Sequence, residues 1–306
     1  MKAPERKILV PLDFEEQSLN ALRYSFELAE LFKCDLILVY VIEGISVFGK
    51  LRSPEEYLNK VVAEAREKFD ELEQLAKSLS DKPSVKVSYR IKQGKPYDKI
   101  IETAYENDVF LIVMGKNGNL SLRKNRTIMG SNTLNVIRES QRPVFTISSN
   151  VINPANISNI LLPLDFTGQT KKQVQNAIDF GKLFDAQITV VSILTGDNRI
   201  LQLRKQVQLS QVKKAIRKHG IVCKASLIHS KGKMIADWVV EHSKRIEADL
   251  IIIMTQQKTK VVEFYVGSTA QKIISHSSVP VLSIFPASPQ RAALIAPMVD
   301  PFGVMG

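Results

Sequence analysis

The sequence has few cysteines, few histidines and no long apolar run. Its two cysteines, Cys34 and Cys223, favour reduced thiols over a disulfide or metal role. None of the four histidines stands at metal-ligand spacing from another histidine or a cysteine, so no metal site is expected. The longest apolar runs, such as 109–114 and 250–254, are far short of the roughly 20 residues that cross a bilayer. Residues 1–7 are polar, and we expect a cytoplasmic protein with no membrane partner.

Negative charge is scarce in the second half of the chain. The net charge is +11, of which residues 1–150 contribute +2 and residues 151–306 contribute +9. A basic half could attract nucleic acid, but its cations are scattered and no aromatic ladder lies between them. We therefore interpret this half as a solvated basic surface and expect no nucleic-acid partner.

One segment of the first half returns in the second. Residues 7–14, KILVPLDF, come back at 159–166 as NILLPLDF. A repeat of about 150 residues is too long for a solenoid unit and indicates two copies of one domain. We expect domains at 1–150 and 151–288, followed by a C-terminal tail at 289–306.

Short apolar runs alternate with helical spacing in both halves. This order is typical of parallel sheets covered by helices on both faces. The expected strands lie at 8–12, 36–42, 85–91, 109–114 and 144–147, and at 160–164, 188–194, 221–228, 250–254 and 281–284.

The first half carries ligand-binding features at predicted strand ends. Open parallel sheets bind ligands beyond the carboxyl ends of their strands. Asp13 follows the first strand, Val41 closes the second, and Met114-Gly115-Lys116-Asn117-Gly118 follows the fourth. Glycines there let backbone N–H groups approach an anion. The segment Gly130-Ser131-Asn132-Thr133 opens a helix, whose N-terminus favours phosphate, although Ser131 could equally be a simple N-cap.

These residues resemble the universal stress protein family. The strand ending in Asp13, the pair Gly115-x-x-Gly118, the Gly130-Ser131 helix start and Gly94-Lys95-Pro96 carry the resemblance, which covers residues 5–149 and 157–285. It implies an α/β fold with two tandem, doubly wound, five-stranded parallel-sheet domains of strand order 3-2-1-4-5, similar to the adenine nucleotide alpha hydrolases.

The resemblance also implies an adenine nucleotide site in the first domain only. Asp13 and the Val41 backbone would meet ribose and adenine. The glycines, together with Ser131 and Thr133, would surround the phosphates of ATP, bound alone or with magnesium. Eleven residues separate Gly118 from Gly130 where the family has nine, and Lys116, Arg123, Lys124 and Arg126 keep this loop basic. The expected binding residues are Pro11, Asp13, Val41, Met114, Gly115, Gly118, Gly130, Ser131, Asn132 and Thr133.

The second half lacks the matching glycines. We expect Thr255 and Lys258 to stand in their places, with eight residues between Lys258 and Gly267-Ser268-Thr269. Side chains there would crowd a phosphate, although Lys258 could instead neutralise an anion itself. We interpret this half as degenerate and kept for pairing through the last strands of the two domains.

The leading hypothesis is a stress-response protein that binds ATP or another adenine nucleotide in its first domain. No nucleophile–base pair is visible, so no catalytic residue is assigned and at most weak ATP hydrolysis is expected. The alternative is a nucleotide-independent scaffold or regulator acting through an unknown protein partner. Pairing of strands 144–147 and 281–284 would give an intramolecular pseudo-dimer, and a further homodimer is left open.

Overall fold

The strands and helices alternate along the whole chain. The computed structural model describes residues 6–43, 54–79, 85–116, 129–147, 153–166, 168–255 and 266–285. The first half contains β1 (Lys7–Leu12), α1 (Glu16–Phe32), β2 (Asp35–Ile42), α2 (Pro54–Leu79), β3 (Val87–Gln93), α3 (Pro96–Glu106), β4 (Leu111–Gly115), α4 (Ser131–Glu139) and β5 (Val144–Ile147). After the short 3-10 helix η2 (Pro154–Asn156), the second half contains β6 (Asn159–Pro163), α5 (Thr170–Phe184), β7 (Gln187–Leu194), α6 (Arg199–Lys218), β8 (Cys223–His229), α7 (Ile235–Arg245), β9 (Leu250–Met254), α8 (Ser268–His276) and β10 (Val281–Ile284).

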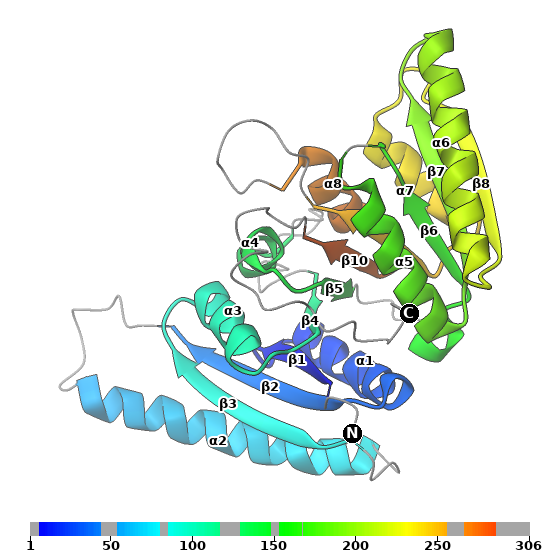
Figure 1. Ribbon diagram of the computed structural model, residues 1–306. Helices are drawn as coiled ribbons and strands as arrows, with labels where there is room; N and C mark the ends of the chain where they lie inside the picture. The colour runs from blue at the N-terminus through cyan, green and yellow to red at the C-terminus, as the bar shows by residue number, and fades with distance from the viewer. Residues whose placement is uncertain are drawn as a thin grey trace.

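These strands form one ten-stranded mixed sheet (Figure 1). The strand order is β3-β2-β1-β4-β5-β10-β9-β6-β7-β8, so each half has the expected order 3-2-1-4-5. Pairing within each half is parallel, and the two halves meet through the antiparallel pair β5–β10. The predicted α/β fold is confirmed, and its two five-stranded sheets continue into one another.

The junction between the halves is buried. Thr146 lies opposite Val281, and Phe145 lies opposite Leu282. The Thr146 hydroxyl donates a hydrogen bond to the Val281 carbonyl oxygen at 3.1 Å. All residues of β5 and β10 are buried, so each last strand covers the edge of the other. The expected pairing of the last strands within one chain is confirmed.

Two layers of helices cover the sheet, one on each face. Helices α1, α2, α5 and α6 contribute to one buried apolar cluster, whereas α3, α4, α7 and α8 contribute to the other. Both clusters contain side chains from both halves. On the first face, the ring of Phe32 in α1 lies 5.2 Å from that of Phe184 in α5. The halves therefore share two continuous cores.

Local sequence sets where several helices begin. Gly94 has a φ of +140°, and Pro96 then begins α3, where its fixed φ suits the first turn. Asn198 caps α6 by accepting a hydrogen bond from the Leu201 N–H at 3.0 Å. No helix within the described ranges is both long and apolar enough to span a bilayer.

Candidate functional site

The predicted site residues of the first half converge at the carboxyl ends of three neighbouring strands. Strand β1, which contains Pro11 and precedes Asp13, pairs with β2 on one side and β4 on the other. Val41 lies near the end of β2, and Gly115 ends β4. The strand order reverses beside β1, which is where open α/β sheets bind ligands. The structure thus brings this part of the predicted set together.

Asp13 closes the turn that leads into α1. Its Oδ1 atom accepts a hydrogen bond from the Glu15 N–H at 3.0 Å, and its own N–H donates to the Ser18 hydroxyl at 3.3 Å. The next residue, Phe14, has a left-handed backbone with φ 62°, and Phe166 repeats this in the second half with φ 61°. The exposed carboxylate therefore has a structural role in the turn.

Gly115 is required by the packing of α1 against β4. A Cβ atom at this position would lie 2.8 Å from the carbonyl oxygen of Gln17 and 2.9 Å from its carbonyl carbon. Both atoms belong to the backbone in the first turn of α1, so they cannot move aside as a flexible side chain could. The glycine that was predicted to approach phosphate thus also permits a close contact between helix and strand.

Replacing Gly115 with alanine should therefore destabilise the fold. We expect Gly115→Ala to lower the free energy of unfolding by about 1–3 kcal/mol, the usual cost of overpacking. Gly168→Ala is the matched control, because a Cβ there meets no atom within 4 Å. Urea unfolding of both variants checks this, and equal stabilities of the two would contradict the close contact as the reason for the glycine.

The N-terminus of α4 lies beside the end of β4. The Thr133 hydroxyl donates to the Gly115 carbonyl oxygen at 3.1 Å, and the Gly130 N–H donates to the Lys116 carbonyl oxygen at 3.2 Å. Gly130 is the N-cap, and the Leu134 N–H makes the first backbone bond of the helix, back to Gly130. The N–H groups of the first turn, at Ser131, Asn132 and Thr133, are thus the donors that a helix leaves for an anion.

Lys116 was expected to keep the loop basic, but its side chain points elsewhere. It is only 6% exposed, and its Nζ atom donates to the Ser277 carbonyl oxygen at 2.9 Å. Ser277 is the C-cap of α8 in the second half. Burial lowers the pKa of Lys116 to about 8. This cation therefore links the site to the other half of the molecule and is not directed at a phosphate.

Gln17 also lies at this end of the sheet, and no sequence pattern indicated it. Its backbone contacts the Gly115 position, and its Oε1 atom is buried with no hydrogen-bond partner among the described residues. A buried acceptor without a donor is unfavourable by about 1–3 kcal/mol. Gln17 is therefore a candidate contact for a ligand that can donate a hydrogen bond.

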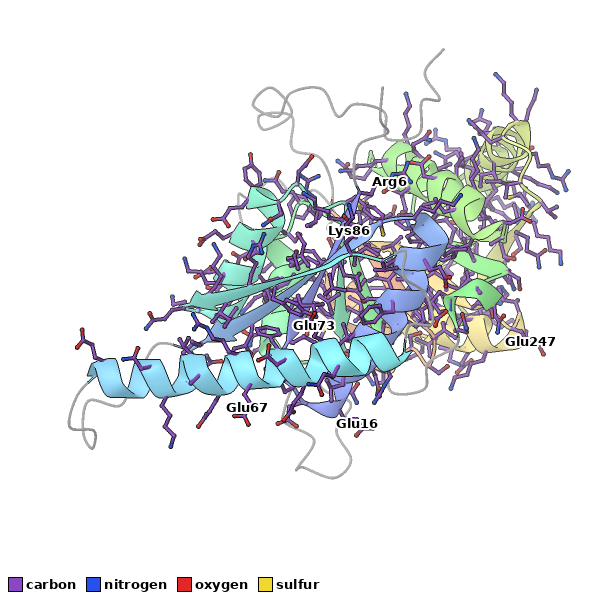
Figure 2. All side chains as sticks on the ribbon, turned by 90° about the horizontal axis from the view of Figure 1, so that it is seen from below. Arg6, Glu16, Glu67, Glu73, Lys86 and Glu247 are labelled. Carbon is purple, nitrogen blue, oxygen red and sulfur yellow. The ribbon has the colours of Figure 1, made fainter. Side chains whose placement is uncertain are left out.

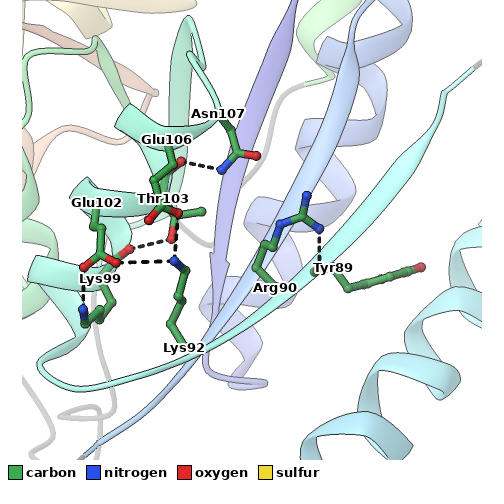
Figure 3. A network of polar contacts seen from close by, with 8 residues as sticks. All are labelled: Tyr89, Arg90, Lys92, Lys99, Glu102, Thr103, Glu106 and Asn107. Carbon is green, nitrogen blue, oxygen red and sulfur yellow. Dashed lines mark hydrogen bonds and ion pairs between the residues drawn. The ribbon is translucent and has the colours of Figure 1, made fainter.

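Two lysines, Lys92 on β3 and Lys99 on α3, are paired with carboxylates, as Figure 3 shows. The Nζ atom of Lys92 lies 2.8 Å from Glu106 and 3.4 Å from Glu102, and Lys99 also pairs with Glu102. The hydrogen bond that Lys92 donates to Glu106 contributes most to raising the pKa of Lys92. These lysines balance the local charge of α3 and add no net positive charge for an anion.

The second half differs from the first at the end of its fourth strand. Leu9 pairs with Ile112, and the equivalent Leu161 pairs with Ile251, so Met254 occupies the position of Gly115. The prediction that Thr255 matches Gly115 is therefore wrong by one residue. The error arose because the second half has no glycine at the end of this strand by which the two sequences could be aligned.

The corrected register also changes which residue of the second half corresponds to Gly118. Counting on from Met254 places Gln257, not Lys258, opposite Gly118, and nine residues then precede Gly267. Helix α5 begins at Thr170, two positions later than α1 does in the repeat, and this backbone change accompanies the larger side chain of Met254. The second half has thus kept the loop length of nine but lost both glycines.

Some predicted residues lie outside the described residues. These are Gly118, Arg123, Lys124, Arg126 and Lys258. Of the remaining predicted binding residues, Met114, Gly130 and Thr133 are buried, while Pro11, Val41, Gly115 and Asn132 are half-buried and Asp13 and Ser131 are exposed. Within the ranges described, no three His, Cys, Asp or Glu side chains are grouped as metal ligands.

Sequence comparison gives the same family for both halves. The universal stress protein family matches residues 5–148 and 156–284. Universal stress protein MJ0577 of Methanocaldococcus jannaschii is 31% identical over 163 residues, which are 48% of this chain and 97% of that protein. Universal stress protein YxiE of Bacillus subtilis is 25% identical over 146 residues, covering 46% of this chain and 97% of that protein.

Structural comparison shows the tandem fold in another protein. A universal stress protein from Archaeoglobus fulgidus aligns 97% of its chain with 92% of this one, at a TM-score of 0.72 and 19% identity. A further structure from Archaeoglobus fulgidus, a universal stress protein in complex with dAMP, aligns with 42% of this chain and 98% of its own, at a TM-score of 0.35 and 22% identity.

Proposed function

Because the chain belongs to the universal stress protein family, we propose that it is a stress-response protein whose first half binds ATP or another adenine nucleotide. The observation that carries the proposal is the grouping at the end of β4. There, Gly115 and the first turn of α4 are joined by the hydrogen bond from Thr133 to Gly115. Small residues and unpaired N–H donors at a helix N-terminus suit a phosphate chain.

Asp13, Val41 and Gln17 would then hold the nucleoside. Asp13 follows β1, Val41 lies near the end of β2, and Gln17 lies in the first turn of α1 beside Gly115. The ribose and base would extend on this side of β4. When magnesium accompanies the nucleotide, its charge would offset that of the phosphates, and the exposed carboxylate of Asp13 would supply a further oxygen ligand. The first half is proposed to bind and orient the nucleotide, with turnover at most weak.

The second half is proposed to serve pairing rather than nucleotide binding. Its α8 begins at Ser268 after Gly267, so a helix N-terminus is available there too. Met254 nevertheless places a side chain where the first half has only backbone. The second half also supplies β10, which covers the edge of β5.

Variants at matched positions test which half binds. We expect Gly118→Val to abolish most ATP binding in isothermal calorimetry, because a branched side chain would occupy phosphate space. The matched control is Gln257→Val, which should bind as the wild type does. Equal loss in both variants, or normal binding by Gly118→Val, would contradict the assignment. Mass spectrometry of small molecules released by denaturation would identify the nucleotide.

A nucleotide-independent scaffold acting through a protein partner is the second candidate. Two structural roles favour it: Gly115 is already explained by its contact with Gln17, and Asp13 by its turn. On this account, the wild type binds no adenine nucleotide, and both valine variants behave alike. The calorimetric experiment therefore distinguishes the two candidates.

A further inference from the structure

Helix α6 is strongly basic and lies at one end of the molecule. It covers the outer strands β7 and β8 on one face of the sheet, far from the first half (Figure 1). No acidic residue occurs among its 20 positions. Its cations are Arg199, Arg204, Lys205, Lys213, Lys214, Arg217 and Lys218.

The same helix exposes apolar side chains on its outer face. Ile200, Leu203 and Val207 are 66%, 63% and 57% exposed, and their spacing of three and four residues places them in one stripe. The opposite face buries Leu209 and Ile216 in the core. The stripe therefore does not contribute to the packing of the helix on the sheet. A contiguous exposed apolar stripe is typical of an interaction surface.

A cavity of about 590 Å³ adjoins this stripe, between the first turns of α6 and the turn after β6. Its lining includes Phe166, Leu201 and Arg204 together with Leu203 and Val207 of the stripe. On the inner side, Lys205 donates a hydrogen bond to the Ser192 hydroxyl at 3.1 Å and lies 5.6 Å from the centre of the Phe166 ring. The outer face thus offers both apolar surface and a concave region lined by the cations Arg204 and Lys205 and by the carboxylate of Asp165.

The equivalent helix of the first half has the opposite character. Helix α2 carries seven acidic and four basic residues, and Figure 2 shows Glu67 and Glu73 on it, with α6 at the far side of the molecule. Tyr40 and Tyr89 of the first half pack with Phe69 of α2. The equivalent positions in the second half hold the smaller residues Ser192 and Ala225. The basic character of α6 is therefore not shared by the equivalent helix of the first half and is not a consequence of the shared fold.

We propose that α6 docks the second half on the surface of an anionic lipid bilayer. Ile200, Leu203 and Val207 would enter the boundary between headgroups and acyl chains, and the flanking cations would pair with lipid phosphates. The expectation of no membrane partner came from the lack of a spanning run, and a helix lying on the surface needs none. Nucleic acid would use the cations but leave the apolar stripe exposed, and the acidic residues of α2 in a second copy would complement the cations but not the apolar stripe.

Vesicle sedimentation of the full chain tests this proposal. We expect the wild type to bind vesicles of about one-third phosphatidylglycerol in phosphatidylcholine, and not vesicles of phosphatidylcholine alone. Leu203→Ser combined with Val207→Ser should lower the partition coefficient about tenfold. Lys214→Glu combined with Lys218→Glu should lower it most at low salt, where surface charges act over a longer range.

The matched control is Tyr105→Ser on α3, because Tyr105 is also 66% exposed but lies in the first half. It should bind vesicles as the wild type does, with circular dichroism confirming that all variants are folded. Absence of binding to the anionic vesicles, or equal binding by the serine double variant, would overturn the proposal. Binding of DNA or self-association that is lost in these variants, without vesicle binding, would overturn it in favour of those occupants.

Discussion

Phe145→Ala is expected to lower the free energy of unfolding by about 3–5 kcal/mol, the usual loss when a buried phenylalanine is truncated. Phe145 is fully buried in β5, opposite Leu282 of β10. Its ring centre lies 5.6 Å from that of Tyr24 in α1. The side chain thus stands where strands of both halves and a covering helix meet, and little around it can collapse into the space that it would leave.

The same variant should reveal whether the halves unfold together. The wild type should show one cooperative transition in urea, because both apolar clusters contain residues from both halves. Phe145→Leu is the control and should cost much less, since it preserves most of the buried volume. A wild type with two separate transitions, or an alanine variant as stable as the leucine variant, would contradict the shared core.

Stability should also depend on pH through Lys116. Burial lowers the pKa of its amine to about 8, against 10.5 in an exposed lysine. Between these values the unfolded chain holds a proton that the folded chain has released, so the free energy of unfolding rises with pH. The rise should be about 1.4 kcal/mol per pH unit and approach about 3 kcal/mol in total.

Two substitutions isolate this effect. Lys116→Met has no titrating group, and Lys116→Arg stays charged throughout the range, so the wild type should gain stability relative to both from pH 8 to about 10.5. Burial raises the pKa of the Cys34 and Cys223 thiols to about 12 and 11, which weakens all three proteins alike at high pH. Urea unfolding at several pH values measures the difference. A constant difference would show that Lys116 is not buried as a charged group.

Apolar runs and helix signals predicted most of the architecture. The runs at 250–254 and 281–284 coincide with β9 and β10, because buried strands leave an uninterrupted apolar signature. The third strand of the first half begins at Val87 and not at 85, and this edge strand has fewer neighbours to fix its start. Pairing of the last strands was predictable because two apolar edges in one chain each need cover.

The site was harder to predict, because its contacts are not local. Lys116 binds the Ser277 carbonyl oxygen 161 positions away, and no nearby sequence pattern indicates that a lysine amine will be buried. The steric need for Gly115 comes from Gln17 on another element, whereas its resemblance to a family motif suggested only phosphate. The place of Met254 follows from strand pairing and not from the residues around it.

The contact between Lys116 and Ser277 has no equivalent on the other side of the junction. Thr255 stands at the position matching Lys116, and its hydroxyl donates a hydrogen bond to the Ile284 carbonyl oxygen within its own half. In a homodimer with two-fold symmetry, one gene specifies both sides, so any residue that suits one side must suit the other. A chain that contains both copies is released from this restriction. Each half can accumulate its own substitutions. A buried charge can then be present in one half even where a second copy in the other half would be unfavourable.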